Sequence, residues 1–155
     1  MKVTLILKPD SRYGKQYYTA LLNLHNALYA DQRVKLNDLN GRDGFGGADS
    51  LDGIWGPNDV MALAIDENDN AVGFLSFGIS GKNAQRWLWI HNFYVDASQR
   101  GRGVGTLLMD TVKAYGKTKG CRFMQLTVLD NNDAALAMYQ KMGFRTEMQD
   151  MVKEL

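Results

Sequence analysis

One short segment constrains the fold of this chain most, because three of its residues are glycines at every second position. The segment is Arg100-Gly101-Arg102-Gly103-Val104-Gly105. It follows an aromatic, β-rich run at residues 86–95. Apolar residues then recur at the three- and four-residue spacing of one helix face, up to Tyr115. A strand, a glycine-spaced loop and a helix in this order predict an α/β layered arrangement, with the loop at a crossover between layers.

Similar patterns predict the other elements. Short β-rich runs at residues 3–8, 60–65, 71–79 and 123–129 predict strands, and the polar turn at 66–70 makes the middle pair a hairpin. Helical periodicity covers 13–30 and 132–142, with a shorter helical piece at 34–39 and a final strand from Phe144 onward. A length of 155 residues fits a single domain over 1–155.

Composition excludes several classes of function. A formal net charge of +1 gives no sequence-wide reason to bind nucleic acid or an anionic membrane. The single cysteine, Cys121, excludes an internal disulfide framework and a cysteine-cluster metal site, and we expect it to be a small filler residue without a metal. No apolar run approaches the roughly 20 residues that span a bilayer. A cytoplasmic location is therefore the default expectation.

The glycine segment predicts an anion site. The first N–H groups of a helix have no intrahelical partner and carry partial positive charge. A phosphate approaches main-chain amides closely only where side chains are absent, which Gly101, Gly103 and Gly105 provide. A P-loop is excluded, because Thr106 stands where its lysine belongs. A dinucleotide fold stays a minor alternative, with mis-spaced glycines but an acid, Asp130, after the next strand.

Two further patterns carry a family resemblance. Arg100-x-x-Gly103-x-Gly105 matches the acyl-CoA signature Arg/Gln-x-x-Gly-x-Gly/Ala. On the next helix, Asn132-x-x-Ala135-x-x-x-Tyr139-x-x-x-Gly143-Phe144 matches a second signature at independent spacing. With both in order, the chain resembles the GNAT superfamily of N-acetyltransferases. The resemblance implies a mixed, mostly antiparallel sheet flanked by helices.

The resemblance also implies how acetyl-CoA, the co-substrate, is held. Main-chain amides from Arg100 to Thr106 would bind its pyrophosphate, and Arg100 or Arg102 would pair with its 3′-phosphate. The strand at Phe93, Tyr94 and Val95 would part from the next strand and bind the pantetheine arm through its main chain. Asn132 would contact that arm through its side chain. The implied cofactor-binding set is Phe93, Tyr94, Val95, Arg100, Gly101, Arg102, Gly103, Val104, Gly105, Thr106 and Asn132.

Two residues are candidates for acid–base chemistry. By the same resemblance, the phenol of Tyr139 would donate a proton to the departing CoA sulfur, although its place in an apolar stripe also fits core packing. His91 stands where polyamine-acetylating relatives carry a glutamate, and an imidazole suits a base at neutral pH. An ordered water with main-chain carbonyls is the competing base. His25, on the first helix, is expected to be structural.

The acceptor is the least constrained part of the reaction. The loop at 40–58 contains six glycines, and we interpret it as either a solvated connection or a substrate lid. Its acids and tryptophan favour a small amine-bearing molecule. Weak candidates for contacting the amine are Asn92, Asp43, Asp49, Asp52 and Trp55. The alternative acceptor is a protein or peptide, and the alternative function is a non-catalytic acyl-CoA sensor. A homodimer could also form through exposed strand edges.

Overall fold

The computed structural model describes residues 1–155 and contains one five-stranded sheet. The strands lie in chain order, β1-β2-β3-β4-β5, with antiparallel pairing except between β4 and β5, which run parallel. The resulting mixed, mostly antiparallel sheet confirms the predicted fold class. The strands are β1 (Lys2–Ile6), β2 (Val60–Ile65), β3 (Ala71–Ser80), β4 (Trp87–Val95) and β5 (Phe123–Gln125).

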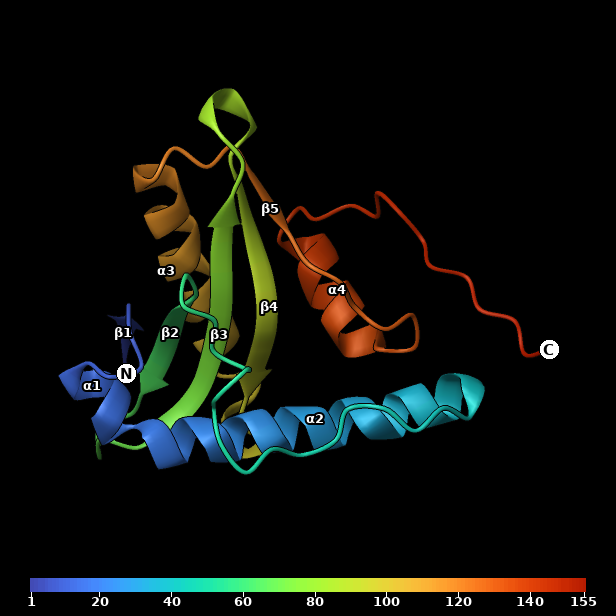
Figure 1. Ribbon diagram of the computed structural model, residues 1–155, viewed down its shortest axis with the longest axis horizontal. Helices are drawn as coiled ribbons and strands as arrows, with labels where there is room; N and C mark the ends of the chain where they lie inside the picture. The colour runs from blue at the N-terminus through green and yellow to red at the C-terminus, as the bar shows by residue number, and fades with distance from the viewer.

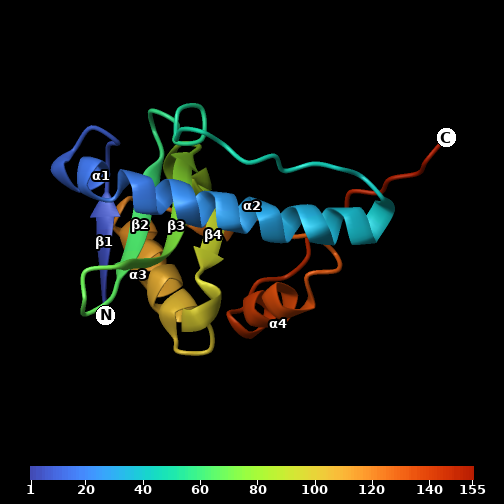
Figure 2. The ribbon, with the colours of Figure 1, turned by 90° about the horizontal axis from the view of Figure 1, so that it is seen from below.

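Helices cover both faces of the sheet. The long helix α2 crosses one face and α3 packs on the other, while α4 lies beyond β4 on the side of β5 (Figures 1 and 2). None of the helices combines the length and apolar character needed to cross a bilayer. The helices are α1 (Arg12–Gln16), α2 (Tyr18–Asn40), α3 (Val104–Thr118) and α4 (Asp133–Lys141), with short 3₁₀ turns η1 (Asn83–Gln85) and η2 (Ala97–Gln99).

Each face of the sheet has its own hydrophobic core. The core beneath α2 joins Leu21 and Leu28 of the helix to Phe74 of β3. The core beneath α3 joins Leu108 and Val112 to strand residues such as Phe77. Strand side chains alternate between the two faces, so β2 and β3 are buried on both sides and their sequences are almost continuously apolar. This rigid sheet positions the sites that lie at β4.

Four predicted elements differ from the structure, three of them in extent and one by its absence. The helix predicted at 13–30 breaks at Tyr17, and its continuation runs through the predicted piece at 34–39 as one helix to Asn40. The strand predicted at 123–129 pairs only to Gln125, because the chain parts from β4 beyond that residue although β4 itself continues to Val95. No strand follows Phe144. Residues 145–155 lack regular structure and extend away from the sheet (Figure 1).

The glycine-rich loop is largely exposed, as a solvated connection would be, but a few contacts anchor it to α2. It returns alongside α2 toward the start of β2 (Figures 1 and 2). The side-chain amide of Asn26 both donates to the carbonyl of Ala48 (2.9 Å) and accepts from its N–H (2.8 Å). The phenol oxygen of Tyr18 accepts from the N–H of Leu51 at 2.9 Å. Leu51 is itself buried in the α2 core, so the loop is a fixed part of that face.

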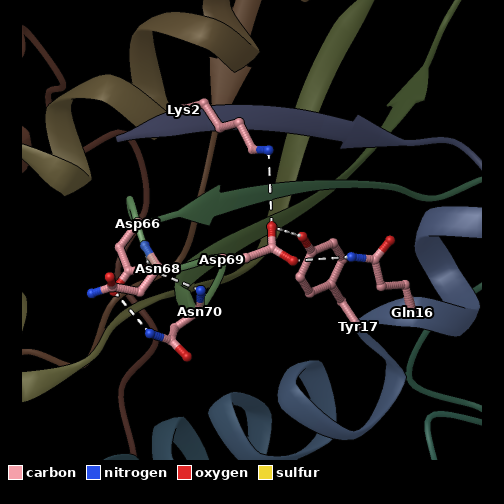
Figure 3. A network of polar contacts seen from close by, with 7 residues as sticks. All are labelled: Lys2, Gln16, Tyr17, Asp66, Asn68, Asp69 and Asn70. Atoms are coloured by element: carbon pink, nitrogen blue, oxygen red, sulfur yellow. Dashed lines mark hydrogen bonds and ion pairs between the residues drawn. The ribbon is translucent and has the colours of Figure 1, made fainter.

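A polar network ties the β2–β3 turn to the first helices (Figure 3). Asp69, at the turn, accepts from the phenol of Tyr17 (2.6 Å) and from the side-chain amide of Gln16 (3.2 Å), and lies 3.9 Å from the ammonium of Lys2. The bond to Asp69, followed by burial, raises the pKa of Tyr17 to about 12. This network joins β1, the α1–α2 junction and the hairpin, at the end of the sheet edge formed by β1.

Candidate functional site

The start of α3 presents main-chain N–H groups that bind nothing else in the chain. Gly103 is the N-cap, and no side chain caps the helix. The amides of Gly101, Arg102 and Gly103 donate to no other main-chain group. Gly101 and Gly103 have φ of 74° and 81°, and a Cβ on either would meet no atom within 4 Å. An anion can therefore reach these amides directly, at the positive end of a helix.

Gly105 serves a different purpose from the other two glycines. A Cβ at this position would lie 3.3 Å from Phe93 Cζ and 3.7 Å from Met138 Sδ. The missing side chain lets α3 lie close to both β4 and α4. The main-chain amides of residues 101–106, called the anion cradle below, are thus placed against the strand that the sequence predicts to bind pantetheine.

The sheet opens beside this cradle. Pairing between β4 and β5 is confined to Trp87–Trp89 opposite Phe123–Gln125. From Ile90 to Val95, β4 has no neighbour on its β5 side. The unpaired edge leads from the parallel ladder to the loop that precedes α3, with α4 across the opening (Figure 1). An extended ligand can align with β4 as an added strand would.

The phenol of Tyr139 lies within this opening. Its ring centroid is 6.3 Å from that of Phe93 on β4 and 5.7 Å from that of Phe144, in an edge-to-face arrangement. Burial raises the pKa of Tyr139 to about 12, so the phenol carries its proton throughout the physiological range. Nearby, a cavity of about 490 Å³ is lined by Thr106 of α3 and, on the α4 side, by Ala137, Met138, Lys141 and Met142.

The two arginines of the motif differ in their surroundings. The Arg100 guanidinium donates to the carbonyl of Val95 (3.0 Å) and to Asp31 of α2 (2.9 Å), and lies 5.2 Å from the ring centroid of Tyr94. Its side chain therefore anchors the loop to β4 and α2. The side chain of Arg102 is exposed and makes no hydrogen bond or ion pair within the chain. Asn132 caps α4 without using its side chain, which leaves that amide available as well.

A β-bulge at His91 shapes the other side of β4. Asn92 pairs with Ser76 and Ile90 with Phe77, so His91 is an extra residue without a partner on β3. In a regular strand, His91 and Asn92 would face opposite sides of the sheet. The bulge places both on the α2 face, where the Asn92 amide donates to the hydroxyl of buried Ser76 at 3.0 Å.

An aspartate that sequence reasoning missed lies against His91. Oδ1 of Asp59 is 3.3 Å from Nε2 of His91, and Gly78 of β3 lies beneath both groups. Asp59 follows the glycine-rich loop just before β2, far from His91 in the chain, and no local pattern marks it. The only sequence signal was that an acid ends a loop suspected of binding substrate.

Two of the loop residues suggested as acceptor contacts, Trp55 and Asp43, have other partners within the chain. Trp55 is 6% exposed and belongs to the α2 core, where its indole N–H donates to the carbonyl of Asp59 (3.0 Å). Asp43 forms a two-point ion pair with Arg33 on the exposed part of α2, at 2.6 and 3.0 Å. His25 is buried against Tyr29, and desolvation lowers its pKa, as expected of a structural residue. No group of three or more His, Cys, Asp or Glu side chains could hold a metal ion.

Comparison with protein families gives a match over most of the chain. Residues 19–144 match the model of the acetyltransferase (GNAT) family. The chain belongs to this family. An uncharacterized N-acetyltransferase of Methanocaldococcus jannaschii is 35% identical over 89 residues, which are 56% of this chain and 38% of that protein. The L-2,4-diaminobutyric acid acetyltransferase of Shouchella clausii is 33% identical over 85 residues, 55% of this chain and 47% of the relative. The chain thus spans about half or less of these relatives.

Solved structures share the fold over the whole length of the chain. A mutant of a Bacillus halodurans protein superposes with a TM-score of 0.82 at 21% identity, covering 100% of this chain and 99% of the other. An aminoglycoside N-acetyltransferase, AAC(6')-Iy, in complex with a bisubstrate analog of CoA superposes with a TM-score of 0.68 at 18% identity, covering 99% and 97%. At these identities the likeness establishes the fold alone.

Proposed function

We propose that this GNAT chain transfers the acetyl group of acetyl-CoA to a primary amine of a small molecule, by direct attack within a ternary complex. The observation that carries the proposal is the continuity between the uncapped start of α3 and the unpaired edge of β4. One binds an anion and the other an extended chain, and CoA combines a pyrophosphate with an extended pantetheine arm. Both are main-chain features, which hold a ligand without a side-chain constellation.

The residues of this chain would hold CoA as follows. The amides from Gly101 to Thr106 bind the pyrophosphate, and Arg102 contributes the free guanidinium for the 3′-phosphate. The main chain of Phe93 and Val95 and the side chain of Asn132 orient the pantetheine arm. Arg100 does not contact CoA but holds the loop in place through its hydrogen bonds to Val95 and Asp31. Acetyl-CoA supplies the activated acetyl group when bound.

Tyr139 supplies the proton for the leaving sulfur. A phenol with a pKa of about 12 stays protonated at neutral pH, so it is ready to donate. A thiol has a pKa of about 8.5, so complete proton transfer to a free thiolate is unfavourable from so weak an acid. We therefore propose that the phenol hydrogen-bonds to the sulfur as negative charge develops and that the proton moves together with C–S cleavage.

His91 is the proposed base. An acceptor amine is an ammonium at neutral pH and must lose a proton before its nitrogen can form the amide bond. The imidazole of His91 is 38% exposed on the α2 face of the bulged strand, so a substrate can reach it. An ordered water held by β4 carbonyls is the competing base. Replacement of His91 by Gln separates these, because the water mechanism predicts little change in kcat.

The acceptor class rests on the relatives and on the polar α2 face. Named relatives include a spermine/spermidine N(1)-acetyltransferase of Bacillus subtilis and a streptothricin acetyltransferase of Streptomyces lavendulae. We propose a polyamine-, amino-acid- or aminoglycoside-like amine. A protein or peptide amine is the alternative. A panel assay of CoA release from acetyl-CoA with polyamines, diamino acids, aminoglycosides and peptides decides between them.

Binding and turnover are tested separately. Calorimetry should detect CoA and acetyl-CoA in the micromolar range, and no affinity at millimolar concentrations would end the proposal. A non-catalytic acyl-CoA sensor would bind CoA but release none in the panel. A dinucleotide-binding protein would instead be stabilised by a nicotinamide cofactor.

We also propose that the chain forms a homodimer. The outer edge of β5 is unpaired, and the 145–155 segment exposes Met148, Met151 and Val152. Unpaired strand edges and exposed apolar side chains both favour association. Sedimentation equilibrium measures the mass, and a monomer at 100 μM would contradict the dimer.

A further inference from the structure

The contact between Asp59 and His91 joins two segments that the fold brings together. His91 is the extra residue of the β4 bulge, and Asp59 ends the packed loop that returns along α2. Nε2 of the imidazole lies 3.3 Å from Oδ1 of the carboxylate. The histidine is 38% exposed and the aspartate 21%, so the ring faces solvent while the carboxylate is largely covered.

The Asp59 carboxylate is oriented by the turn that precedes it. Its other oxygen, Oδ2, accepts from the N–H of Gly56 at 2.9 Å, and its own N–H donates to the carbonyl of Gly56 at 3.1 Å. Its carbonyl accepts from the indole of Trp55, which is anchored in the core. With one oxygen held and the main chain fixed, Oδ1 has a set direction, toward the imidazole.

Gly78 makes room for this contact. A Cβ at residue 78 would lie 3.0 Å from His91 Nε2 and 3.2 Å from Asp59 Oδ1. These distances are shorter than ordinary van der Waals contact, so any side chain at 78 would press on both partners. The contact therefore depends on three elements, namely the loop, the β4 bulge and a position on β3 that has no side chain.

We propose that Asp59 is a positioning residue for His91. It keeps the imidazole proton on Nε2, so that Nδ1 is the nitrogen that accepts the proton of the acceptor amine. This inference rests on the proposed function, in which His91 is the base. A carboxylate beside the ring fixes its tautomer and orientation and stabilises the imidazolium formed by proton transfer.

The proton balance of the step is complete with these groups. One ammonium proton moves to His91 Nδ1, and the freed lone pair forms the C–N bond to the acetyl carbon while the C–S bond breaks. The sulfur takes the proton of the Tyr139 phenol. The attacking nitrogen then carries one proton too many for an amide, and that proton leaves to solvent. His91 also releases its proton to solvent, and Tyr139 takes one up from it. Asp59 takes part in no proton transfer.

The contacts of the Asp59 carboxylate argue against a direct role in binding the amine. Its two oxygens are both engaged, one by Gly56 and the other by His91. An ammonium would have to displace one of these contacts. An amine-binding carboxylate and a positioning carboxylate also predict different kinetics, since removing the first raises KM and removing the second lowers kcat.

The first test measures the tautomer without any catalysis. In ¹⁵N-labelled protein at a pH where His91 is neutral, NMR should show the ring proton on Nε2. In Asp59→Asn, the new amide oxygen can still accept from Gly56, which turns its NH₂ group toward Nε2. Nε2 must then accept, and the proton should move to Nδ1. An unchanged tautomer in the variant, or a wild-type proton on Nδ1, would overturn the inference.

The second test compares kinetics across matched variants. Asp59→Asn should lower kcat by about 10- to 100-fold with KM for the amine changed less than about threefold. Asp10→Asn, the same chemical change at an exposed carboxylate, should have no effect. The double variant Asp59→Asn, His91→Gln should be no slower than His91→Gln alone, because the two residues act as a unit. A rise in KM alone would overturn the positioning role.

A third variant guards against a folding defect. Gly78→Ala leaves Asp59 and His91 chemically intact but separates them, and it should reproduce the loss in kcat. Normal turnover in both Gly78→Ala and Asp59→Asn, alongside a slow His91→Gln, would reject Asp59 and retain His91 as base. A fully active His91→Gln would reject both. A wild-type protein that acetylates no amine would reject the proposed function, and the tautomer measurement would then decide alone whether Asp59 controls the ring.

Discussion

The two faces of β4 are built in different ways. On the α3 face, the proposed CoA site consists mainly of main-chain groups, namely the amides before α3 and the unpaired edge of β4, with Arg102 and Asn132 adding side-chain contacts. On the α2 face, the proposed acceptor site consists of side chains from three separate elements, His91, Asp59 and Asn92 with its partner Ser76.

The difference determines what a substitution does on each face. A main-chain site depends on backbone conformation, so it fails when φ is disturbed and tolerates changes of side-chain chemistry nearby. A side-chain site depends on contacts between distant residues, so it fails when one functional group is changed and the backbone stays the same. Each prediction below tests this contrast.

The largest expected effect follows from removing the Tyr139 hydroxyl. Tyr139→Phe should lower kcat by about 100-fold or more, because the leaving sulfur loses its proton donor. The affinity for CoA should stay within twofold, since binding depends on main-chain groups. Steady-state kinetics and calorimetry measure the two quantities. Tyr115→Phe, a phenol on the same face outside the opening, is the control, and a similar loss there would refute a specific role.

Strain at the cradle should come next in size. Gly101→Ala or Gly103→Ala forces a side chain into a left-handed conformation, which costs about 1–2 kcal/mol. If relaxation of that strain distorts the amides, CoA binds about tenfold more weakly. Gly120→Ala at the other end of α3 has the same strain, with φ of 73°, and is the matched control. Equal loss of CoA affinity in all three variants would mean that general destabilisation is responsible.

A smaller effect should distinguish the two arginines. Arg102→Ala should weaken CoA several-fold and leave 3′-dephospho-CoA unaffected, because only the free guanidinium pairs with the 3′-phosphate. Arg100→Ala should weaken both ligands alike, since Arg100 holds the loop through Val95 and Asp31. Titration of both ligands at two salt concentrations tests this. Identical ligand profiles for the two variants would contradict the assignment.

The smallest effect is a difference in stability at high pH. Tyr17, on the α2 face, has its pKa raised to about 12 by its bond to Asp69. A raised folded-state pKa means that the folded protein holds this proton more tightly than the unfolded chain, whose phenols titrate near 10. The stabilisation is present below pH 10 and is lost as pH rises toward 12. The free energy of unfolding of Tyr17→Phe, measured with urea between pH 9 and 12, should therefore decline less steeply with pH than that of the wild type. The difference in slope should correspond to less than one proton. Equal slopes in the two proteins would contradict the prediction.

The sequence predicted the α3 face better than the α2 face, for the same physical reason. Gly101, Gly103 and the periodic helix are contiguous, so the local pattern predicted both the start of α3 and the family. The Asp59–His91 contact depends on a bulge and on a loop packed by Asn26 and Trp55, which no local pattern encodes. The prediction of the length of β5 was wrong for a similar reason. The run after Gln125 has the composition of a strand but no partner, and pairing requires one.

The bulge at His91 has a consequence for how β4 can change over time. Because it reverses which residues face each helix, the strand on either side of it is matched to a different parity. Exchanging the histidine for another residue alters only local chemistry. Deleting it would close the bulge, because Ile90 and Asn92 already pair with the consecutive residues Phe77 and Ser76. Phe93 would then still face α3, and Tyr94 would still face α2. Both substitution and loss of this residue therefore leave the two cores in register, so the chemistry on the α2 face can change without a change of scaffold.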